Sequence, residues 1–346
     1  MKTLRKSLAI LATAALLAGC STSTSNSTTA STSSTSKEEV YTIGLAQIVD
    51  HPSLNTIREA MLDELEELGY TDGDTIIVNY QNAANKTSNL DSIMSGYEAD
   101  GVNAIVAIAT PTALAAQNYA DSIPVIFSAV SDPVGAGLVE SIEAPGGNIT
   151  GTSDEVQVDQ IVDLMLELSP DIKTVGVLYN AGEANSVSNI QRFKEYAESK
   201  GLTVVEKTGT DNTTMQQAAV ELANSVDAMF SPNDNTVATG MVSLGEVAKN
   251  AGVPYYVGAD SMVETGGFAT VGINYEDLGR ETAKMTVEVL EGKSPSEIAV
   301  KVFKDDLNVY INEEVLQALE ASSKTPVSVP SDLASQDNLI LVQNEE

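Results

Sequence analysis

Small polar side chains stand where the apolar runs of this 346-residue sequence end. One run stops at Thr110-Pro111-Thr112, and the next one stops at Ser131-Asp132. Hydroxyl groups and the free N–H groups at the start of a helix can hold a carboxylate, and a carboxylate side chain can hold an ammonium group. Thr110 and Thr112 are therefore predicted to form a carboxylate seat, with Asp132 as a candidate partner for an ammonium group.

A second set of the same kind follows later in the chain. The segment 226–261 repeats the order of the segment 102–133: an apolar run, a polar turn, a helical pattern, a second apolar run and a polar end. Asn233 lies in its first turn, and Asp260 lies at its second end as another candidate for an ammonium group. A carboxylate seat combined with an ammonium partner favours an amino acid as the ligand. The alternative is that these residues only cap helices and form turns.

Other predicted strand ends carry polar residues too. Ser153 and Asp154 lie at a predicted crossover between the two halves. His51 is the only histidine, and a histidine before a proline can equally be a residue of a loop or a helix start. The predicted ligand-binding residues are Gln47, His51, Thr110, Thr112, Asp132, Ser153, Asp154, Asn180, Glu183, Asn185, Ser186, Asn233 and Asp260. The same strand ends also carry Ser131, Gly182, Asp234 and Asn235, which remain outside this set.

Strands that alternate with helices position these residues. Continuous apolar runs such as 104–109 and 123–130 are typical of strands buried on both faces of a parallel sheet, where ligands bind beyond the carboxyl ends. The sequence therefore predicts an α/β fold with one parallel sheet in each of two lobes. The other predicted strands are 40–47, 75–80, 148–152, 173–179, 202–206, 268–273 and 299–303. The helices for which the sequence predicts both ends are 52–68, 87–98, 185–199, 213–224, 275–290 and 313–319. The polar tail after Ser322 is predicted to be loosely docked.

The first residues read as a secretory signal. A basic start is followed by an apolar run over residues 8–18, which is shorter than the roughly 20 residues that a membrane span needs. The run closes on Leu-Ala-Gly-Cys, which resembles the bacterial lipobox and marks Cys20 as the lipidated residue. The alternative is a plain cleaved signal. Residues 21–36 contain no hydrophobic side chain longer than alanine, so they are predicted to be a flexible tether.

Composition excludes several kinds of function. The formal net charge of −31 makes nucleic acid and anionic lipid headgroups unsuitable as direct partners. One cysteine allows no internal disulfide, and one histidine without a dense carboxylate cluster predicts neither a metal site nor a cofactor. No Gly-x-Ser-x-Gly or phosphate-binding glycine motif occurs, so the sequence does not predict an enzyme.

Several segments match the pattern of one family. The chain resembles the solute-binding lipoproteins of bacterial ABC importers, in the subgroup associated with the uptake of tryptophan, tyrosine and phenylalanine. Asn233 departs from the pattern, because a threonine is expected there, and this puts the ligand contact at Asn233 in doubt. The matching segments are 43–52, 109–113, 131–139, 148–154, 178–186 and 270–275.

The resemblance implies a type I periplasmic-binding-protein fold, with two Rossmann-like parallel-sheet lobes joined by three crossovers and closing on a ligand at the strand ends. It implies an aromatic amino acid as ligand, an ABC permease and its ATPase as partners, and a monomer anchored by lipid to the outer face of the cell membrane. The expected division is a signal peptide at 1–20, a tether at 21–39, an N-terminal lobe at 40–152 plus 273–300, and a C-terminal lobe at 153–272 plus 301–335.

Three alternatives stay open. The protein could be a receptor of the same fold for a nucleoside or a sugar, a surface adhesin or sensor lipoprotein, or a hydrolase, although no hydrolase motif supports the last. Five aromatic residues near strand ends could stack on a ligand ring, but most are expected to be core residues. They are Phe127, Tyr179, Phe230, Tyr255 and Tyr256.

Overall fold

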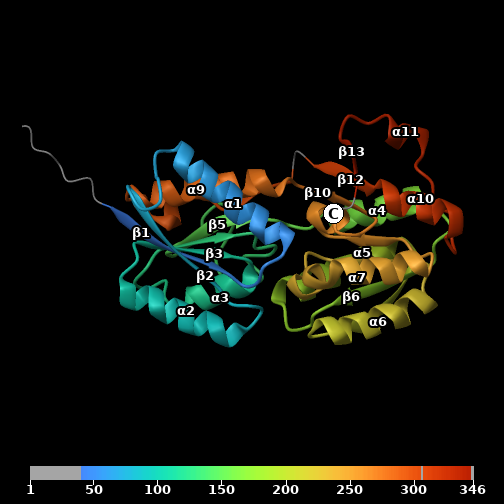
Figure 1. Cartoon of the computed structure of the whole chain (residues 1–346), viewed down its shortest axis with the longest axis horizontal. Coiled ribbons are helices and arrows are strands. Elements are labelled where there is room, and N and C mark those ends of the chain that lie inside the picture. The colour runs from blue at the N-terminus through green and yellow to red at the C-terminus, as the bar shows by residue number, and fades with distance from the viewer. Residues whose placement is uncertain (1–39, 305–306, 344–346) are drawn as a thin grey trace, which may run out of the picture. The chain divides into compact units, whose positions relative to one another are not determined.

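The computed structural model describes residues 40–304 and 307–343. The predicted signal segment, Cys20 and the whole of the predicted tether lie outside the described residues. The described part of the chain is built on two β-sheets flanked by helices, as Figure 1 shows. The predicted α/β class, with one largely parallel sheet in each half, is confirmed.

The first sheet has the strand order β11-β5-β4-β3-β1-β2, and every pair in it is parallel. The central strand β3 reads AIVAI and is buried along its whole length, as expected for a strand covered by helices on both faces. Its strands are β1 (Tyr41–Gln47), β2 (Ile76–Asn82), β3 (Ala104–Ile108), β4 (Val125–Ser128), β5 (Ile149–Ser153) and β11 (Lys301–Val302).

The second sheet has the order β13-β12-β10-β9-β8-β6-β7, and only the β10–β12 pair is antiparallel. Its strands are β6 (Thr174–Tyr179), β7 (Thr203–Thr208), β8 (Ala228–Ser231), β9 (Tyr255–Val257), β10 (Ala269–Gly272), β12 (Asn308–Asn312) and β13 (Leu339–Val342). The order β7-β6-β8-β9-β10 repeats the order β2-β1-β3-β4-β5 of the first sheet. Both sheets therefore have their change of strand order next to the first strand, where α/β proteins bind ligands at the carboxyl ends.

Helices cover both faces of each sheet. In the first half, α1 and α9 lie side by side on one face, and α2 and α3 pack on the other. In the second half, α4 packs with α5, and α6 packs with α7. The helices are α1 (Pro52–Glu67), α2 (Thr87–Asp100), α3 (Thr110–Gln117), α4 (Val158–Leu168), α5 (Ala184–Ser199), α6 (Asn212–Ser225), α7 (Asn235–Asn250), α8 (Asp260–Glu264), α9 (Tyr275–Leu290), α10 (Glu313–Ser322) and α11 (Ser331–Ala334). A short 3₁₀ turn spans Pro295–Glu297.

The contact between α1 and α9 shows how sequence spacing sets the packing. Leu54, Ile57 and Met61 recur at helical spacing and are buried. A Cβ atom at Gly279 of α9 would lie 2.4 Å from the Ile57 carbonyl oxygen, so only glycine allows the two helices to approach this closely. The pair fixes the start of α1, and therefore the position of the β1–α1 loop that precedes it.

The chain passes between the sheets after β5, after β10 and between β11 and β12, in agreement with the three crossovers that the resemblance implies. Two details differ from the sequence prediction. Residues 301–302 were assigned to the C-terminal lobe, but β11 pairs with β5 in the first sheet. The tail is also better anchored than predicted, because β13 pairs with β12 and both Val327 and Leu333 are buried.

Candidate functional site

A small cavity lies where the carboxyl ends of the two sheets face each other. The residues that line it follow strands of both sheets: β1, β3, β4 and β5 in the first, and β6, β8, β9 and β10 in the second. The lining residues are His51, Ser53, Leu54, Ala109, Thr110, Ala129, Asp154, Asn185, Asn233, Asn235, Ala238, Met262 and Tyr275. Five of the predicted ligand-binding residues are among them: His51, Thr110, Asp154, Asn185 and Asn233.

On the side of the first sheet, two hydroxyl groups are buried without a partner among the described residues. They belong to Thr110 and Thr112, in the first turn of α3. Ala109 precedes them with φ 75° and ψ 153°, a backbone region that residues other than glycine rarely adopt and that costs roughly 1–3 kcal/mol. Ala129, after β4, also has a positive φ of 56°. The backbone at this cavity wall is therefore strained at two neighbouring strand ends.

Asp154 is the carboxylate in the cavity lining. Its Oδ1 accepts a hydrogen bond from Ser131 Oγ (3.0 Å), and its Oδ2 accepts from Tyr275 OH (3.0 Å) and Asn233 Nδ2 (2.5 Å). Burial raises the pKa of Asp154 to about 6, although these three hydrogen bonds act in the opposite direction. No cationic side chain of the described residues forms an ion pair with it. The group is thus a buried anion that is held only by neutral donors.

On the side of the second sheet, Asn233 reaches across to the first. Its Nδ2 donates to Ser131 Oγ (2.8 Å) as well as to Asp154, and its Oδ1 accepts from Asn189 Nδ2 (3.1 Å). Because Asn189 donates to Asn233 Oδ1, it is the Nδ2 end of the Asn233 amide that faces Asp154. Asn185 donates to the Asn233 carbonyl oxygen, while its own Oδ1 is buried without a partner among the described residues.

Glu183 does not line the cavity, because its carboxylate is committed to the start of α7. Its Oε2 accepts from the backbone N–H and the Nδ2 of Asn235, and its Oε1 accepts from the backbone N–H and the hydroxyl of Thr236. Asp234 beside it accepts from Asn180 N, Ser186 Oγ and Val237 N. Burial, together with the neighbouring Asp234 charge, raises the pKa of Glu183 to about 7.

Two buried contacts link the start of α1 to the second half. His51 Nε2 lies 3.3 Å from Asn235 Oδ1, and Ser53 Oγ lies 2.5 Å from Ser261 Oγ. Burial lowers the pKa of His51 to about 4, so its ring is neutral at physiological pH. The apolar part of the lining comes from the same region, with Leu54 on α1 and Met262 on α8.

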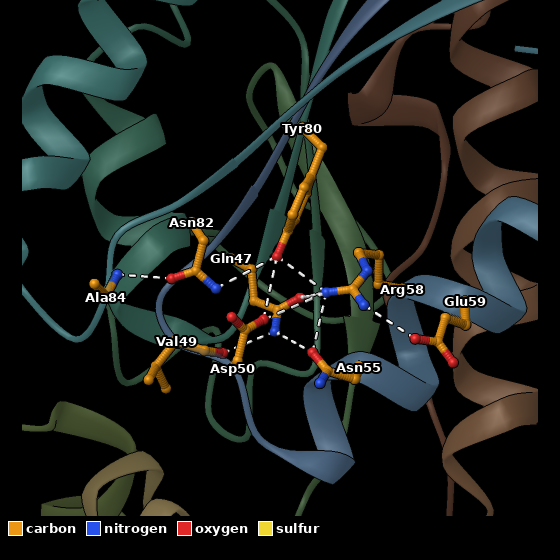
Figure 2. A network of polar contacts seen from close by, with 9 residues as sticks. All are labelled: Gln47, Val49, Asp50, Asn55, Arg58, Glu59, Tyr80, Asn82 and Ala84. Carbon is orange, nitrogen blue, oxygen red and sulfur yellow. Dashed lines mark hydrogen bonds and ion pairs between the residues drawn. The ribbon is translucent and has the colours of Figure 1, made fainter.

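Gln47 is predicted as a ligand-binding residue, but it is not among the residues that line the cavity. It belongs to the network of polar contacts that Figure 2 shows. Its Nε2 donates to the Val49 carbonyl oxygen (2.7 Å) and to Asn55 Oδ1 (2.8 Å), and its Oε1 accepts from Arg58 Nη1 (3.1 Å). Arg58 also stacks over the ring of Tyr80, 4.9 Å from its centroid. These bonds hold the β1–α1 loop, so Gln47 positions His51 indirectly.

The other predicted residues also lie outside the lining. Asp132 accepts from Gly135 N and from Ser188 Oγ of α5 (2.6 Å), and the latter bond is a further contact between the halves. Asp260 begins α8 and accepts from the N–H of Ser261. Four more predicted residues are absent from the lining: Thr112, Ser153, Asn180 and Ser186. Asn180 and Ser186 donate to Asp234, and Thr112 lies in the first turn of α3.

Sequence reasoning missed several lining residues. Tyr275 follows a strand and stands at the start of a helix after an asparagine, which is a signal that could have found it. Asn235 has the same position after Asp234; the sequence places it at a strand end but outside the predicted set. Ala109, Ala129 and Ala238 carry no chemical signal at all. The five aromatic residues considered for stacking are buried and do not line the cavity, so they are core residues as mainly expected.

No group of three or more histidine, cysteine, aspartate or glutamate side chains among the described residues could hold a metal ion. Within the same residues, no helix is both long enough and apolar enough to cross a membrane.

Two sheets of the same strand order, with a cavity between their carboxyl ends, define a two-lobed binding protein. The family model of ABC transporter substrate binding proteins matches residues 42–333, and the chain belongs to this family. This is a family of binding proteins rather than of enzymes. Its related structures have the type I periplasmic-binding-protein fold, which confirms the fold implied by the resemblance.

Three relatives are similar to this chain over most of its length. A tyrosine-binding protein of Clostridioides difficile is 36% identical over 331 residues, which cover 96% of this chain and 93% of the relative. A Streptococcus pneumonia domain solved in complex with L-Trp is 34% identical, with a TM-score of 0.82 over 88% of this chain and 100% of that one. An open, ligand-free substrate-binding protein with adhesive properties from Clostridium difficile is 38% identical over the same shares, with a TM-score of 0.66.

Proposed function

We propose that this protein is the extracytoplasmic substrate-binding component of an ABC importer and that it captures an aromatic amino acid. One observation carries the proposal: within residues 40–304 and 307–343, the buried carboxylate of Asp154 has no cationic partner and the buried hydroxyl of Thr110 has no hydrogen-bond partner, and both residues line the cavity. An amino acid supplies an ammonium group for the first and a carboxylate for the second. The relatives described with tyrosine and with L-Trp support an aromatic side chain.

Each end of the ligand has a matching set of groups. The ammonium group is assigned to Asp154 and to Asn185 Oδ1, which has no partner among the described residues. Asn233 links these two residues, because it donates to Asp154 and accepts from Asn185. The carboxylate is assigned to the hydroxyl of Thr110 in the cavity lining, with the hydroxyl of Thr112 in the same turn at the positive end of α3. Pro111 carries no N–H group, and the Thr112 N–H already donates to the Ala109 carbonyl oxygen (3.1 Å). The ring is assigned to the apolar lining of Leu54 and Met262.

The mechanism is hinge closure. The lining of the cavity comes from both sheets, so a ligand held there bridges the two halves and favours the closed arrangement. The TM-score is higher with the L-Trp complex than with the open relative, although the open relative has the higher identity, which supports a closed arrangement here. The cavity is small, so an aromatic amino acid enters after the halves have separated.

Delivery and anchoring complete the proposal. Lipidation at Cys20 and a tether over residues 21–36 would hold the binding domain at the outer face of the cell membrane as a monomer, where it hands the amino acid to a permease driven by an ATPase. A Cys20→Ser variant tests the anchor: the protein is expected in the soluble fraction instead of the membrane fraction. Membrane attachment that persists in this variant contradicts the anchor.

Thermal unfolding with a panel of amino acids tests the ligand class. A ligand at 100 times its Kd stabilises the folded state by about 2.7 kcal/mol. The chain contains no tryptophan, so bound L-tryptophan is the only indole fluorophore and its emission reports binding directly. Tryptophan, tyrosine or phenylalanine is expected to raise the Tm, whereas aspartate, lysine, glucose and adenosine are not. A shift by a sugar or nucleoside alone contradicts the ligand class.

Adhesion is a second candidate function. It is favoured by the relative that is 38% identical and is described as a substrate-binding protein with adhesive properties. A strain that lacks this protein separates the two functions: loss of aromatic amino acid uptake supports transport, and loss of attachment to host cells or matrix supports adhesion.

A further inference from the structure

The two ring nitrogens of His51 have different surroundings. The His51 side chain lies at the cavity, and the residue is only 7% exposed. Nε2 lies 3.3 Å from Asn235 Oδ1, while Nδ1 is buried without a hydrogen-bond partner among the described residues. His51 stands at the N-cap position of α1, yet its side chain does not cap that helix. The lone nitrogen therefore has no evident structural use.

The partners of Asn235 decide which nitrogen of His51 carries the hydrogen. Asn235 Nδ2 donates to Glu183 Oε2 (2.6 Å), so its Oδ1 is the end that faces His51. An amide oxygen only accepts, so Nε2–H of the neutral ring must be the donor. Nδ1 is then a bare acceptor, because a neutral imidazole carries one hydrogen only.

A buried acceptor without a donor is costly, and the cost is recovered if a ligand supplies the donor. His51 and Asn235 come from the starts of α1 and α7, and Leu54 and Ala238 of the apolar lining come from the same two helices. The Nδ1 lone pair thus belongs to the part of the lining assigned to the ligand ring. Of the three aromatic side chains, tyrosine carries an O–H donor, tryptophan carries an N–H donor and phenylalanine carries none.

We propose that Nδ1 of His51 accepts a hydrogen bond from the ring of the bound amino acid, so that the site selects tyrosine or tryptophan and discriminates against phenylalanine. The proposal rests on the proposed function, because it assumes that the cavity holds an aromatic amino acid. It adds a basis for choosing among ligands of that class.

Two substitutions at His51 separate its two nitrogens. In His51→Asn the amide oxygen can occupy the place of Nδ1, whereas in His51→Gln the amide group reaches the place of Nε2 and leaves none at Nδ1. The experiment is calorimetric titration of the wild-type protein and both variants with L-tyrosine, L-tryptophan and L-phenylalanine. Thermal unfolding of each variant without added amino acid checks that it folds.

The wild-type protein is expected to bind phenylalanine about 10- to 100-fold more weakly than the best of the other two, which corresponds to the cost of one unsatisfied buried acceptor. In His51→Asn, the preference for tyrosine or tryptophan over phenylalanine should stay about 10- to 100-fold. In His51→Gln, the affinities for phenylalanine and for the best of the other two should differ by no more than about threefold. Equal wild-type affinity for the three amino acids overturns the proposal, as does an equal loss for all three in His51→Gln. If none of the three binds to the wild-type protein, the proposed function fails as well.

Discussion

The carboxyl ends of the two sheets have the same strand order but differ in how their polar groups are engaged. Around the first sheet, the hydroxyls of Thr110 and Thr112 are buried without a partner in the part of the chain that the structure describes. Around the second, Glu183 and Asp234 accept hydrogen bonds from several donors at the start of α7. Asn185 Oδ1 and Asn189 Oδ1 are exceptions on that side, since both are buried without a partner among the described residues. The same topology therefore supports two roles: one edge keeps groups available for a ligand, and the other forms a rigid support.

Asp154 joins the two edges, because it follows β5 of the first sheet and accepts from Asn233 of the second. We therefore expect Asp154 and the unpartnered groups of the described residues to determine ligand binding, and the hydrogen-bonded groups at the start of α7 to determine stability.

Asp154→Asn removes the proposed countercharge of the ligand ammonium while keeping the shape of the side chain. We expect affinity for the amino acid to fall about 100-fold, roughly 2.7 kcal/mol, because a hydrogen bond to a charged group is lost in a buried site. Calorimetric titration measures the loss. Wild-type affinity should also decline below pH 6, by up to about tenfold per pH unit, because protonation of Asp154 (pKa about 6) discharges the carboxylate.

Asp132→Asn is the matched control, since Asp132 lies outside the cavity lining. Its affinity should stay within about threefold of the wild type if the charge acts locally. The assignment of the ammonium group is wrong if Asp132→Asn costs more affinity than Asp154→Asn, or if Asp154→Asn keeps the wild-type pH profile.

Glu183→Gln tests the supporting edge through the pH dependence of stability. The pKa of Glu183 is raised, so the folded state binds a proton more tightly than the unfolded state does. The free energy of unfolding should then decrease as pH rises from about 4.5 to about 7, by roughly 2 kcal/mol, because one pKa unit corresponds to about 1.4 kcal/mol. Chemical denaturation across this range should show a shallower decrease in Glu183→Gln.

Glu206 provides a control with the same substitution. Its pKa is lowered, chiefly by the Lys194 hydrogen bond, so it titrates below this window. Glu206→Gln should leave the slope between pH 5 and pH 7 unchanged. A slope that is the same in the wild type and in Glu183→Gln would show that Glu183 is not a buried, proton-binding part of the support.

Ala109→Gly tests the strained backbone behind the available hydroxyls. Glycine adopts φ 75° and ψ 153° without the clash that a Cβ atom makes. We expect the variant to be about 1 kcal/mol more stable, since relief of strain outweighs the entropy that glycine adds to the unfolded chain. Thermal unfolding measures the difference. Ala115→Gly, inside α3, should instead destabilise by about 1 kcal/mol, and equal losses in both variants would argue against strain at Ala109.

Much of the fold was predictable because many strands and helices depend on the pattern of residues that are close together in the sequence. Continuous apolar runs marked β3 and β4, and the spacing of Leu54, Ile57 and Met61 marked α1. The strands β12 and β13 were missed, because their partners are distant in the sequence and β13 has exposed residues that resemble a polar tail.

By itself, the sequence determined the order of the elements and the places where polar groups follow strands, since both depend on neighbours along the chain. It could not distinguish Asp154 from Asp132 or Asp260, because all three are acidic residues near strand ends. Only the tertiary structure decided that Asp154 faces the cavity, that Glu183 is committed to α7, and that His51 keeps one nitrogen bare. Those outcomes depend on groups that are distant along the chain and meet only when the two sheets are placed together.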